Sequence, residues 1–137
     1  MQQQTALPTI FVLEPDDEVR PVLTQNLKNW GYQVVMACNE SDAMQRVQKH
    51  RRFNLILLNQ FRQSIEESRA IGQLIRKAAG LDGHTSIVIM AEQYGADLEG
   101  QDIQVGEGEC VTYLEDGEQL KRLLYRLCPG CSNSLPN

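Results

Sequence analysis

The sequence lacks several features that would assign it quickly to a class of protein. No apolar run approaches the roughly 18 residues that a membrane span requires. The first residues, Met-Gln-Gln-Gln-Thr, carry neither the basic nor the apolar segment of a signal peptide. Aromatic residues make up only 6% of the 137 residues. These absences favour a cytoplasmic protein without contact to a membrane.

Cysteine is also scarce, because four residues of this type are too few and too scattered for a disulfide framework. Cys128 and Cys131 form a CxxC pattern, which permits a redox pair or half of a zinc site. Neither a second CxxC nor a paired histidine accompanies it. We therefore expect a solvent-facing tail here and predict no metal and no cofactor, with a zinc ion shared between two chains as the alternative.

Positive charge is missing from one long stretch of the chain. The net charge of -5 already argues against direct binding to nucleic acid. Residues 92–118 contain nine acids and no Lys or Arg. This stretch is either a solvated loop or a face that meets a basic partner. The candidates for such an interaction are Asp97, Glu99, Asp102, Glu107 and Glu109.

What is present is a regular alternation of apolar runs with helical patterns, which predicts βαβ units and a parallel sheet. The expected strands are residues 10–13, 32–37, 53–59, 87–90 and 110–114. Helices are expected from near Asp17, from a cap at Asn39 or Ser41 to about His50, over residues 65–79, and along the leucines of residues 120–127. Pro21 is compatible with the first helix only within its first turn.

The strands do not alternate in polarity, so each should be buried on both faces. Five units in a chain of this length predict the flavodoxin-like doubly wound α/β fold, a five-stranded parallel sheet of order 2-1-3-4-5. Four glycines within residues 92–109 make the fourth helix irregular, and we expect short turns followed by a mobile loop. The predicted domain covers residues 8–128, between tails at 1–7 and 129–137.

Three segments, residues 11–20, 53–59 and 111–114, have an order and spacing that resemble the receiver domain of two-component response regulators. The resemblance implies an acidic pair after the first strand and an aspartate that ends the third, which together hold Mg²⁺ and accept phosphate. It also implies a Thr or Ser after the fourth strand and a Lys after the fifth, which sense the phosphoryl group. The functional crevice would lie at the carboxyl ends of the strands.

At most of these positions the chain departs from the family. The acidic pair corresponds to Glu14 and Pro15, so one carboxylate remains and the one more directed to the metal is missing. The acceptor aspartate corresponds to Asn59, whose amide is not a nucleophile. The hydroxyl position falls on Ala91, and the lysine position on Asp116 or, one place earlier, Glu115. The catalytic residues that the resemblance implies are therefore absent.

Three further residues leave alternatives open. Asp16 and Asp17 stand two places after the acidic pair, so they either cap the first helix or turn back into the crevice and rebuild a cation site. Tyr113 matches the aromatic switch position of receivers, and otherwise packs as a half-buried strand residue.

The sequence thus predicts a receiver-like signalling module that is not an enzyme and is not phosphorylated at the usual position. It would act through protein contacts, with a histidine kinase, another signalling complex or a second copy as partner. The alternative is a receiver-like domain that senses a small molecule.

Overall fold

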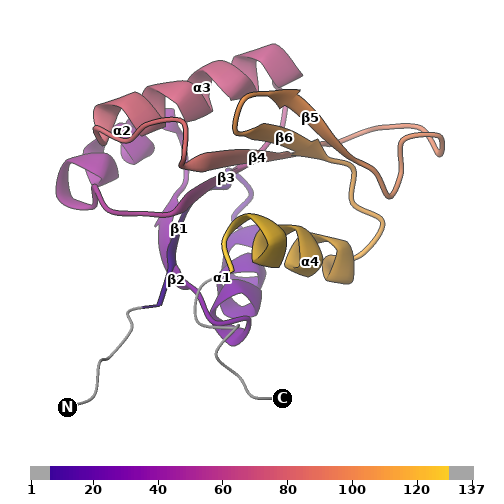
Figure 1. Cartoon of the computed structure of the whole chain (residues 1–137), viewed down its shortest axis with the longest axis horizontal. Helices are drawn as coiled ribbons and strands as arrows, with labels where there is room; N and C mark the ends of the chain where they lie inside the picture. The colour runs from indigo at the N-terminus through magenta and orange to yellow at the C-terminus, as the bar shows by residue number, and fades with distance from the viewer. Residues whose placement is uncertain (1–6, 130–137) are drawn as a thin grey trace.

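In the described part of the chain, six strands form one sheet, with helices packed against both of its faces (Figure 1). The computed structural model describes residues 7–129. In chain order the elements are β1 (Thr9–Leu13), α1 (Val19–Asn29), β2 (Gln33–Ala37), α2 (Glu40–Lys49), β3 (Leu55–Asn59), α3 (Ile65–Ala78), β4 (Ser86–Met90), β5 (Asp102–Gly106), β6 (Glu109–Thr112) and α4 (Gly117–Leu127). None of the helices within these residues is long and apolar enough to cross a membrane.

The strand order is β2-β1-β3-β4-β6-β5, and every neighbouring pair is parallel except β5 with β6. The predicted parallel order 2-1-3-4-5 is confirmed, with β6 as its fifth strand. One strand, β5, was not predicted. It extends the sheet beyond β6 as the outer arm of an antiparallel hairpin.

Burial on both faces of the sheet is confirmed. Neighbouring residues of one strand enter different cores: in β3, Ile56 packs on the face covered by α2 and α3, whereas Leu57 packs on the face covered by α1 and α4. Both side chains are fully buried. The absence of polar alternation in the strands therefore follows from having helices on both sides of the sheet.

The helix boundaries follow the expected local signals. Helix α1 begins at Val19, slightly later than expected, and Pro21 lies in its first turn, where no main-chain donor is lost. The side chain of Asn39, rather than that of Ser41, caps α2 by accepting from the Asp42 amide at 2.7 Å. His50 is the residue after α2, as predicted.

The stretch between β4 and β6 differs from the prediction. Turns over residues 96–100 are present, but a strand takes the place of the mobile loop. Two glycines allow this, since Gly100 and Gly108 have φ of +89° and +70° at the two ends of β5. The sequence signal was weak because β5, Asp-Ile-Gln-Val-Gly, is short and ends in glycine.

The end of the described chain also differs from the prediction in one respect. Cys128 is buried, with 6% of its surface exposed, and its carbonyl accepts from the Tyr32 hydroxyl at 3.0 Å. It belongs to the core between α1 and α4 instead of a solvent-facing tail. Cys131 and the other residues of the predicted tail from 130 to 137 lie outside the described residues, as do residues 1–6.

Candidate functional site

The residues implied by the resemblance meet at the carboxyl edge of the sheet. Glu14 directly follows β1, Asn59 ends β3 and Ala91 directly follows β4. Main-chain bonds hold two of them in place: the Glu14 amide donates to Ala37, and the Ala91 amide donates to Thr112, both at 3.0 Å. The parallel order of the strands thus brings Glu14 and Asn59 together although 45 residues separate them.

Asn59 and Glu14 form a direct side-chain pair. The Asn59 Nδ2 donates to Glu14 Oε1 at 2.8 Å and to Oε2 at 2.9 Å. On its other side, Asn59 Oδ1 accepts from the Phe61 amide at 2.8 Å. An oxygen is required opposite that amide, so the Phe61 bond fixes which end of the Asn59 side chain faces the carboxylate. The amide therefore acts as a donor to Glu14.

The Glu14 carboxylate has no exposed surface. Its Oε2 also accepts from the Asp16 amide at 3.1 Å. Burial raises the pKa of Glu14 above its ordinary value, the negative charges of Asp16 and Glu92 act in the same direction, and the bonds from Asn59 and Asp16 offset them only in part. Among the described residues no arginine binds the carboxylate, since Arg20 donates to the main-chain oxygen of Glu14 at 2.8 Å and pairs with Asp17.

These residues do not fit a magnesium ion. Mg²⁺ prefers oxygen ligands in octahedral geometry, but both oxygens of the only carboxylate in the Glu14–Asn59 pair already face an N–H₂ group. Within residues 7–129, no group of three His, Cys, Asp or Glu side chains could hold a metal ion. The chain thus satisfies its buried carboxylate with an amide where a metal-binding site would need further oxygen ligands.

Asp16 and Asp17 shape the start of α1. Asp16 Oδ1 accepts from the Glu18 amide at 2.8 Å, and the Asp16 carbonyl accepts from the amides of Val19 and Arg20 at 3.1 Å. Asp17 is exposed and pairs with Arg20. Glu18, the residue before α1, makes no side-chain cap. Capping by Asp16 therefore describes the local geometry better than a carboxylate turned into the crevice.

Gln60 is a site residue that sequence reasoning missed. Its Oε1 accepts from the Glu92 amide and its Nε2 donates to the Gln63 carbonyl, both at 2.8 Å, so one side chain joins the loops after β3 and β4. Phe61 and Gln93, on these same two loops, have φ of +53° and +51°. Left-handed conformations at non-glycine residues cost roughly 1–3 kcal/mol each and require support from their surroundings. No sequence motif signals such a bridge.

The residues after β6 lie differently from the sequence assignment. Because β6 ends at Thr112, the first residue beyond it is Tyr113, and Asp116 is already the cap of α4, accepting from the Gln119 amide at 3.0 Å. Tyr113 is half-buried, and its ring meets that of Tyr94 edge to face, with centroids 5.3 Å apart. The Tyr94 hydroxyl donates to the Leu114 carbonyl. Asp116 thus stabilises a helix end, a role that accounts for its charge without a phosphate.

Four of the five interaction candidates, Asp97, Glu99, Asp102 and Glu107, are exposed. The prediction that the fifth, Glu109, lies on the surface is wrong, because only 5% of this residue is exposed. Glu109 accepts from Arg69 Nε at 2.6 Å and from Gln73 Nε2 at 2.7 Å, and Arg76 lies 3.7 Å away.

Burial acts to raise the pKa of Glu109, but the bonds from Arg69 and Gln73 and the charges of Arg69 and Arg76 outweigh it, so the pKa lies below its ordinary value. This cluster fastens the start of β6 to α3.

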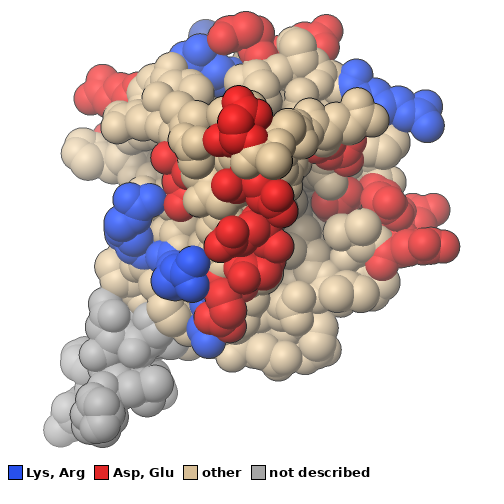
Figure 2. Space-filling view, turned by 90° about the vertical axis from the view of Figure 1, so that its right-hand side faces the viewer, with Lys and Arg blue, Asp and Glu red and all other residues tan. Residues whose placement is uncertain are grey.

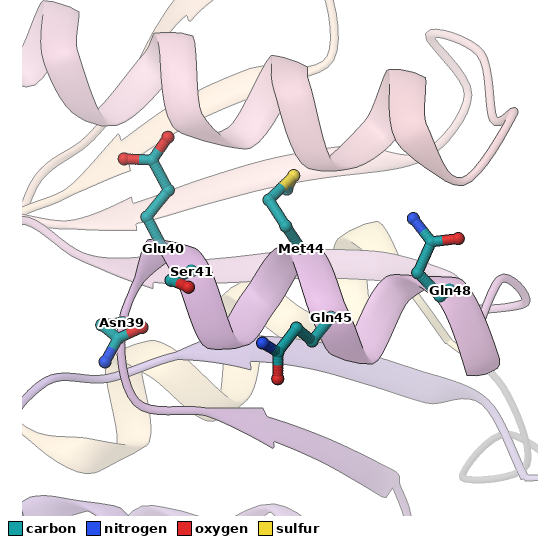
Figure 3. A pocket seen from close by; sticks show the side chains of 6 residues that line it. All are labelled: Asn39, Glu40, Ser41, Met44, Gln45 and Gln48. Atoms are coloured by element: carbon teal, nitrogen blue, oxygen red, sulfur yellow. The ribbon is translucent and has the colours of Figure 1, made fainter.

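A small apolar cavity of about 230 Å³ adjoins Asn59. Its lining includes Pro15, Phe61 and Asn39. Asn39 and Glu40 also border an open depression of about 810 Å³ along α2 (Figure 3). In this view Glu40 and Met44 project to the side of α2 that faces α3. The surroundings of Asn59 therefore include space for a small group, but the larger hollow is an open helix surface.

Comparison with known proteins identifies the fold. No family model and no curated protein matches this sequence. Among solved structures, the chain is similar to a response regulator from Thermotoga maritima, with a TM-score of 0.66 and 18% identity over 91% of this chain and 100% of that chain.

The chemotaxis protein CheY4 of Vibrio cholerae gives a TM-score of 0.61 and 18% identity, covering 89% of this chain and 99% of that one. The response regulator TrrA of Thermotoga maritima, solved in complex with Mg²⁺-BeF, gives 0.63 and 18%, with 88% and 99% covered. At such identities the likeness establishes the fold, which is the flavodoxin-like α/β fold of CheY-like receiver domains.

Proposed function

We propose that this chain is a receiver-like signalling module in a two-component or phosphorelay context, that it is not phosphorylated at Asn59, and that it acts through protein contacts. The likeness of fold to receiver domains supports the signalling context. The observation that carries the rest is the Glu14–Asn59 pair, in which an amide donor occupies the position of a nucleophilic carboxylate.

Three chemical requirements of phosphoryl transfer are unmet in this pair. The Asn59 nitrogen is conjugated with its carbonyl and donates both hydrogen bonds to Glu14, so it has no lone pair to attack phosphorus. The site does not fit Mg²⁺, and Arg20 is bound to the Glu14 carbonyl and to Asp17 instead of facing the crevice carboxylate. A transferring phosphoryl group would therefore lack electrostatic stabilisation.

The direct test is incubation with Mg²⁺ and acetyl phosphate, followed by measurement of the intact mass. We expect an unchanged mass, while a phosphorylatable receiver carried through the same incubation gains one phosphoryl group. A phosphoryl group on this chain, at Asn59 or at Asp16 or Asp17, contradicts the proposal.

A second test uses Mg²⁺ alone. Since Glu14 is already satisfied by Asn59, Mg²⁺ should leave the melting temperature nearly unchanged. A rise that grows with Mg²⁺ concentration and is absent with NaCl of the same ionic strength would show that Glu14 and its acidic neighbours bind a cation after all.

One observation favours a second candidate, a receiver-like domain that senses a small molecule. The cavity beside Asn59 is lined largely by apolar groups, but its volume of about 230 Å³ is below the roughly 300 Å³ at which ligand pockets begin. Native mass and absorbance of the purified protein separate the two functions, because extra mass or a chromophore favours sensing.

A further inference from the structure

We propose that the outer edge of β5 binds an extended, positively charged segment of a partner protein by strand addition. The inference names the partner class for the contact function proposed above, and it does not depend on whether Asn59 is phosphorylated. β5 lies where the sequence predicted a mobile loop.

β5 is the last strand of the sheet and pairs only with β6 among the described residues. A bulge sets which of its main-chain groups face outward. The Gly100 amide donates to the Tyr113 carbonyl at 2.6 Å, and the Tyr113 amide donates to the Gln101 carbonyl at 2.8 Å, with Gly100 at φ +89°. This is the G1 pattern, in which a left-handed glycine supplies the extra residue.

The main-chain groups of an antiparallel strand point alternately toward and away from the neighbouring strand. Because the Gln101 carbonyl points to β6, the N–H and C=O of Ile103 also point to β6, and those of Asp102 and Gln104 point outward. Two outward residues separated by one inward residue match the repeat of a partner strand. The second bulge, between Gln104 and Gly106, ends this regular edge.

Side chains on both faces of β5 are suited to continue the sheet. Ile103 and Val105 are half-buried, and Val105 packs against the core beneath α3. On the opposite face, Asp102 and Gln104 line a hollow of about 310 Å³ together with Arg126 of α4. An added strand would place alternate side chains over the apolar residues and beside this hollow.

The negative charge around β5 indicates which kind of peptide segment would bind there. Figure 2 views the side of the molecule on which β5 lies in Figure 1, and it shows a band of acidic residues running down this face. Of the nine acids between residues 92 and 118, seven are exposed. They are Asp97, Glu99, Asp102, Glu107, Glu115, Asp116 and Glu118. Arg126 comes within 4.0 Å of Asp102 and offsets one of them.

The same charges argue against a second copy of this chain as the binding partner at the β5 edge. Pairing the β5 edges of two copies of this chain would bring two acidic bands together, and like charges in register are unfavourable. A segment with Lys or Arg at alternate positions gains both the outward main-chain bonds and the opposite charge. The partner is therefore a basic extended peptide segment.

The test uses a short, capped synthetic peptide in which Lys and Thr alternate. We expect it to bind, more weakly as NaCl is raised, and to protect the amides of Asp102 and Gln104 from hydrogen exchange while leaving the β6-facing amide of Ile103 unchanged. The same peptide N-methylated at alternate residues keeps its charge but cannot pair on that edge, and its affinity should fall about tenfold or more.

Matched variants examine the protein side. Gln104→Pro removes an outward N–H and should abolish protection, whereas Gln104→Thr keeps it. Neutralising three exposed acids, Asp97→Asn, Glu99→Gln and Glu107→Gln, should weaken binding and flatten its salt dependence. Asp102 is left unchanged, because its Oδ1 accepts from Thr112 and Gln119.

Three outcomes overturn the inference. Equal binding of the N-methylated peptide would mean that the acids attract cations without strand pairing. No binding of the plain peptide would mean that the acids and the bulge close the edge. Self-association that Gln104→Pro abolishes would make a second copy the occupant. Phosphorylation of the wild-type chain, by contrast, would contradict only the proposed function, so the two failures are distinguishable.

Discussion

Two glutamates are buried within residues 7–129, and they differ in the groups that surround them. Glu14, at the carboxyl edge of the sheet, faces the Asn59 amide and a main-chain N–H, with acidic Asp16 and Glu92 nearby. Glu109, at the start of β6, faces two arginines and a glutamine amide. The pKa of the first is raised and that of the second is lowered.

The two carboxylates therefore affect stability in opposite ways. Amide donors bind the lone pairs of Glu14 without supplying positive charge, so the burial of its ionised carboxylate lowers the stability of the fold. The arginines around Glu109 compensate its burial and fasten the hairpin, whose Gly106 and Gly108 leave room for Arg69 and for the Gly83 carbonyl. The ion pairs of Glu109 with Arg69 and Arg76 therefore anchor the β5–β6 hairpin to α3, whereas Glu14 in the crevice has only neutral hydrogen-bond donors.

The largest expected effect comes from breaking the charged network. Glu109→Gln removes the charge that Arg69 and Arg76 neutralise, and unfolding free energy should fall by about 3 kcal/mol. Urea unfolding measures it. Glu107→Gln, in the exposed hairpin turn, is the matched control and should change stability by less than about 0.5 kcal/mol. Equal effects of the two substitutions would show that the network contributes nothing.

The next effect makes the crevice more acidic. Asn59→Asp replaces two donors to Glu14 by a second carboxylate, and stability at neutral pH should fall by about 2 kcal/mol. Acetyl phosphate with Mg²⁺ should still leave the mass unchanged, because Pro15 still replaces the second acidic residue of the metal site and no lysine has been added. Asn54→Asp, just before β3, preserves the acceptor for the Thr9 amide and serves as control. A phosphorylated Asn59→Asp protein would mean that this one amide had been the sole block.

A smaller effect concerns the loops around the crevice. Gln60→Ala removes the bond to the Glu92 amide that joins the loops after β3 and β4, together with the bond to the Gln63 carbonyl within the first loop, and should cost about 1 kcal/mol. Hydrogen exchange of the Glu92 amide should rise at the same time. The exposed Gln63, which contributes only main-chain groups, gives the control Gln63→Ala. Unchanged exchange in Gln60→Ala would mean that the two loops are held by other contacts.

The smallest effect is the opposite pH dependence of the two glutamates. Glu14, with its raised pKa, binds its proton more tightly in the folded state, so its contribution to stability decreases as pH rises above the ordinary value of 4.5. Glu109, with its lowered pKa, contributes stability above pH 4.5 that is lost as pH falls through its folded-state pKa.

Urea midpoints between pH 3 and pH 8 measure both. The cost of Glu109→Gln should shrink in acid, whereas Glu14→Gln should improve relative to the wild type as pH rises. Parallel curves for the two variants would contradict the assignment of opposite shifts.

Local chemistry explains which features could be predicted. The cap at Asn39, the glycine after α3 and the leucine stripe of α4 depend on a few neighbouring residues, so sequence signals found the helices within a few residues. The cap at Asp116 was not predicted. The parallel strands are continuous apolar runs, which locate them well. β5 was not predicted because, as an edge strand, it has few apolar residues. The bond between Gln60 and Glu92 was not predicted because the two residues lie in separate loops that only the folded sheet brings together.

Residue patterns were enough to predict the alternation of strands and helices, the burial of both sheet faces, the asparagine at the end of β3, and the excess of acids between residues 92 and 118. The assembled fold shows in addition that Asn59 donates to Glu14, that Glu109 is buried against α3, and that exposed acids lie on and around β5, the edge strand of the sheet within the described residues. Hydrophobic periodicity acts between neighbours in the chain, whereas the pairing of a buried charge depends on groups up to 45 residues apart that only the assembled sheet brings within hydrogen-bonding distance.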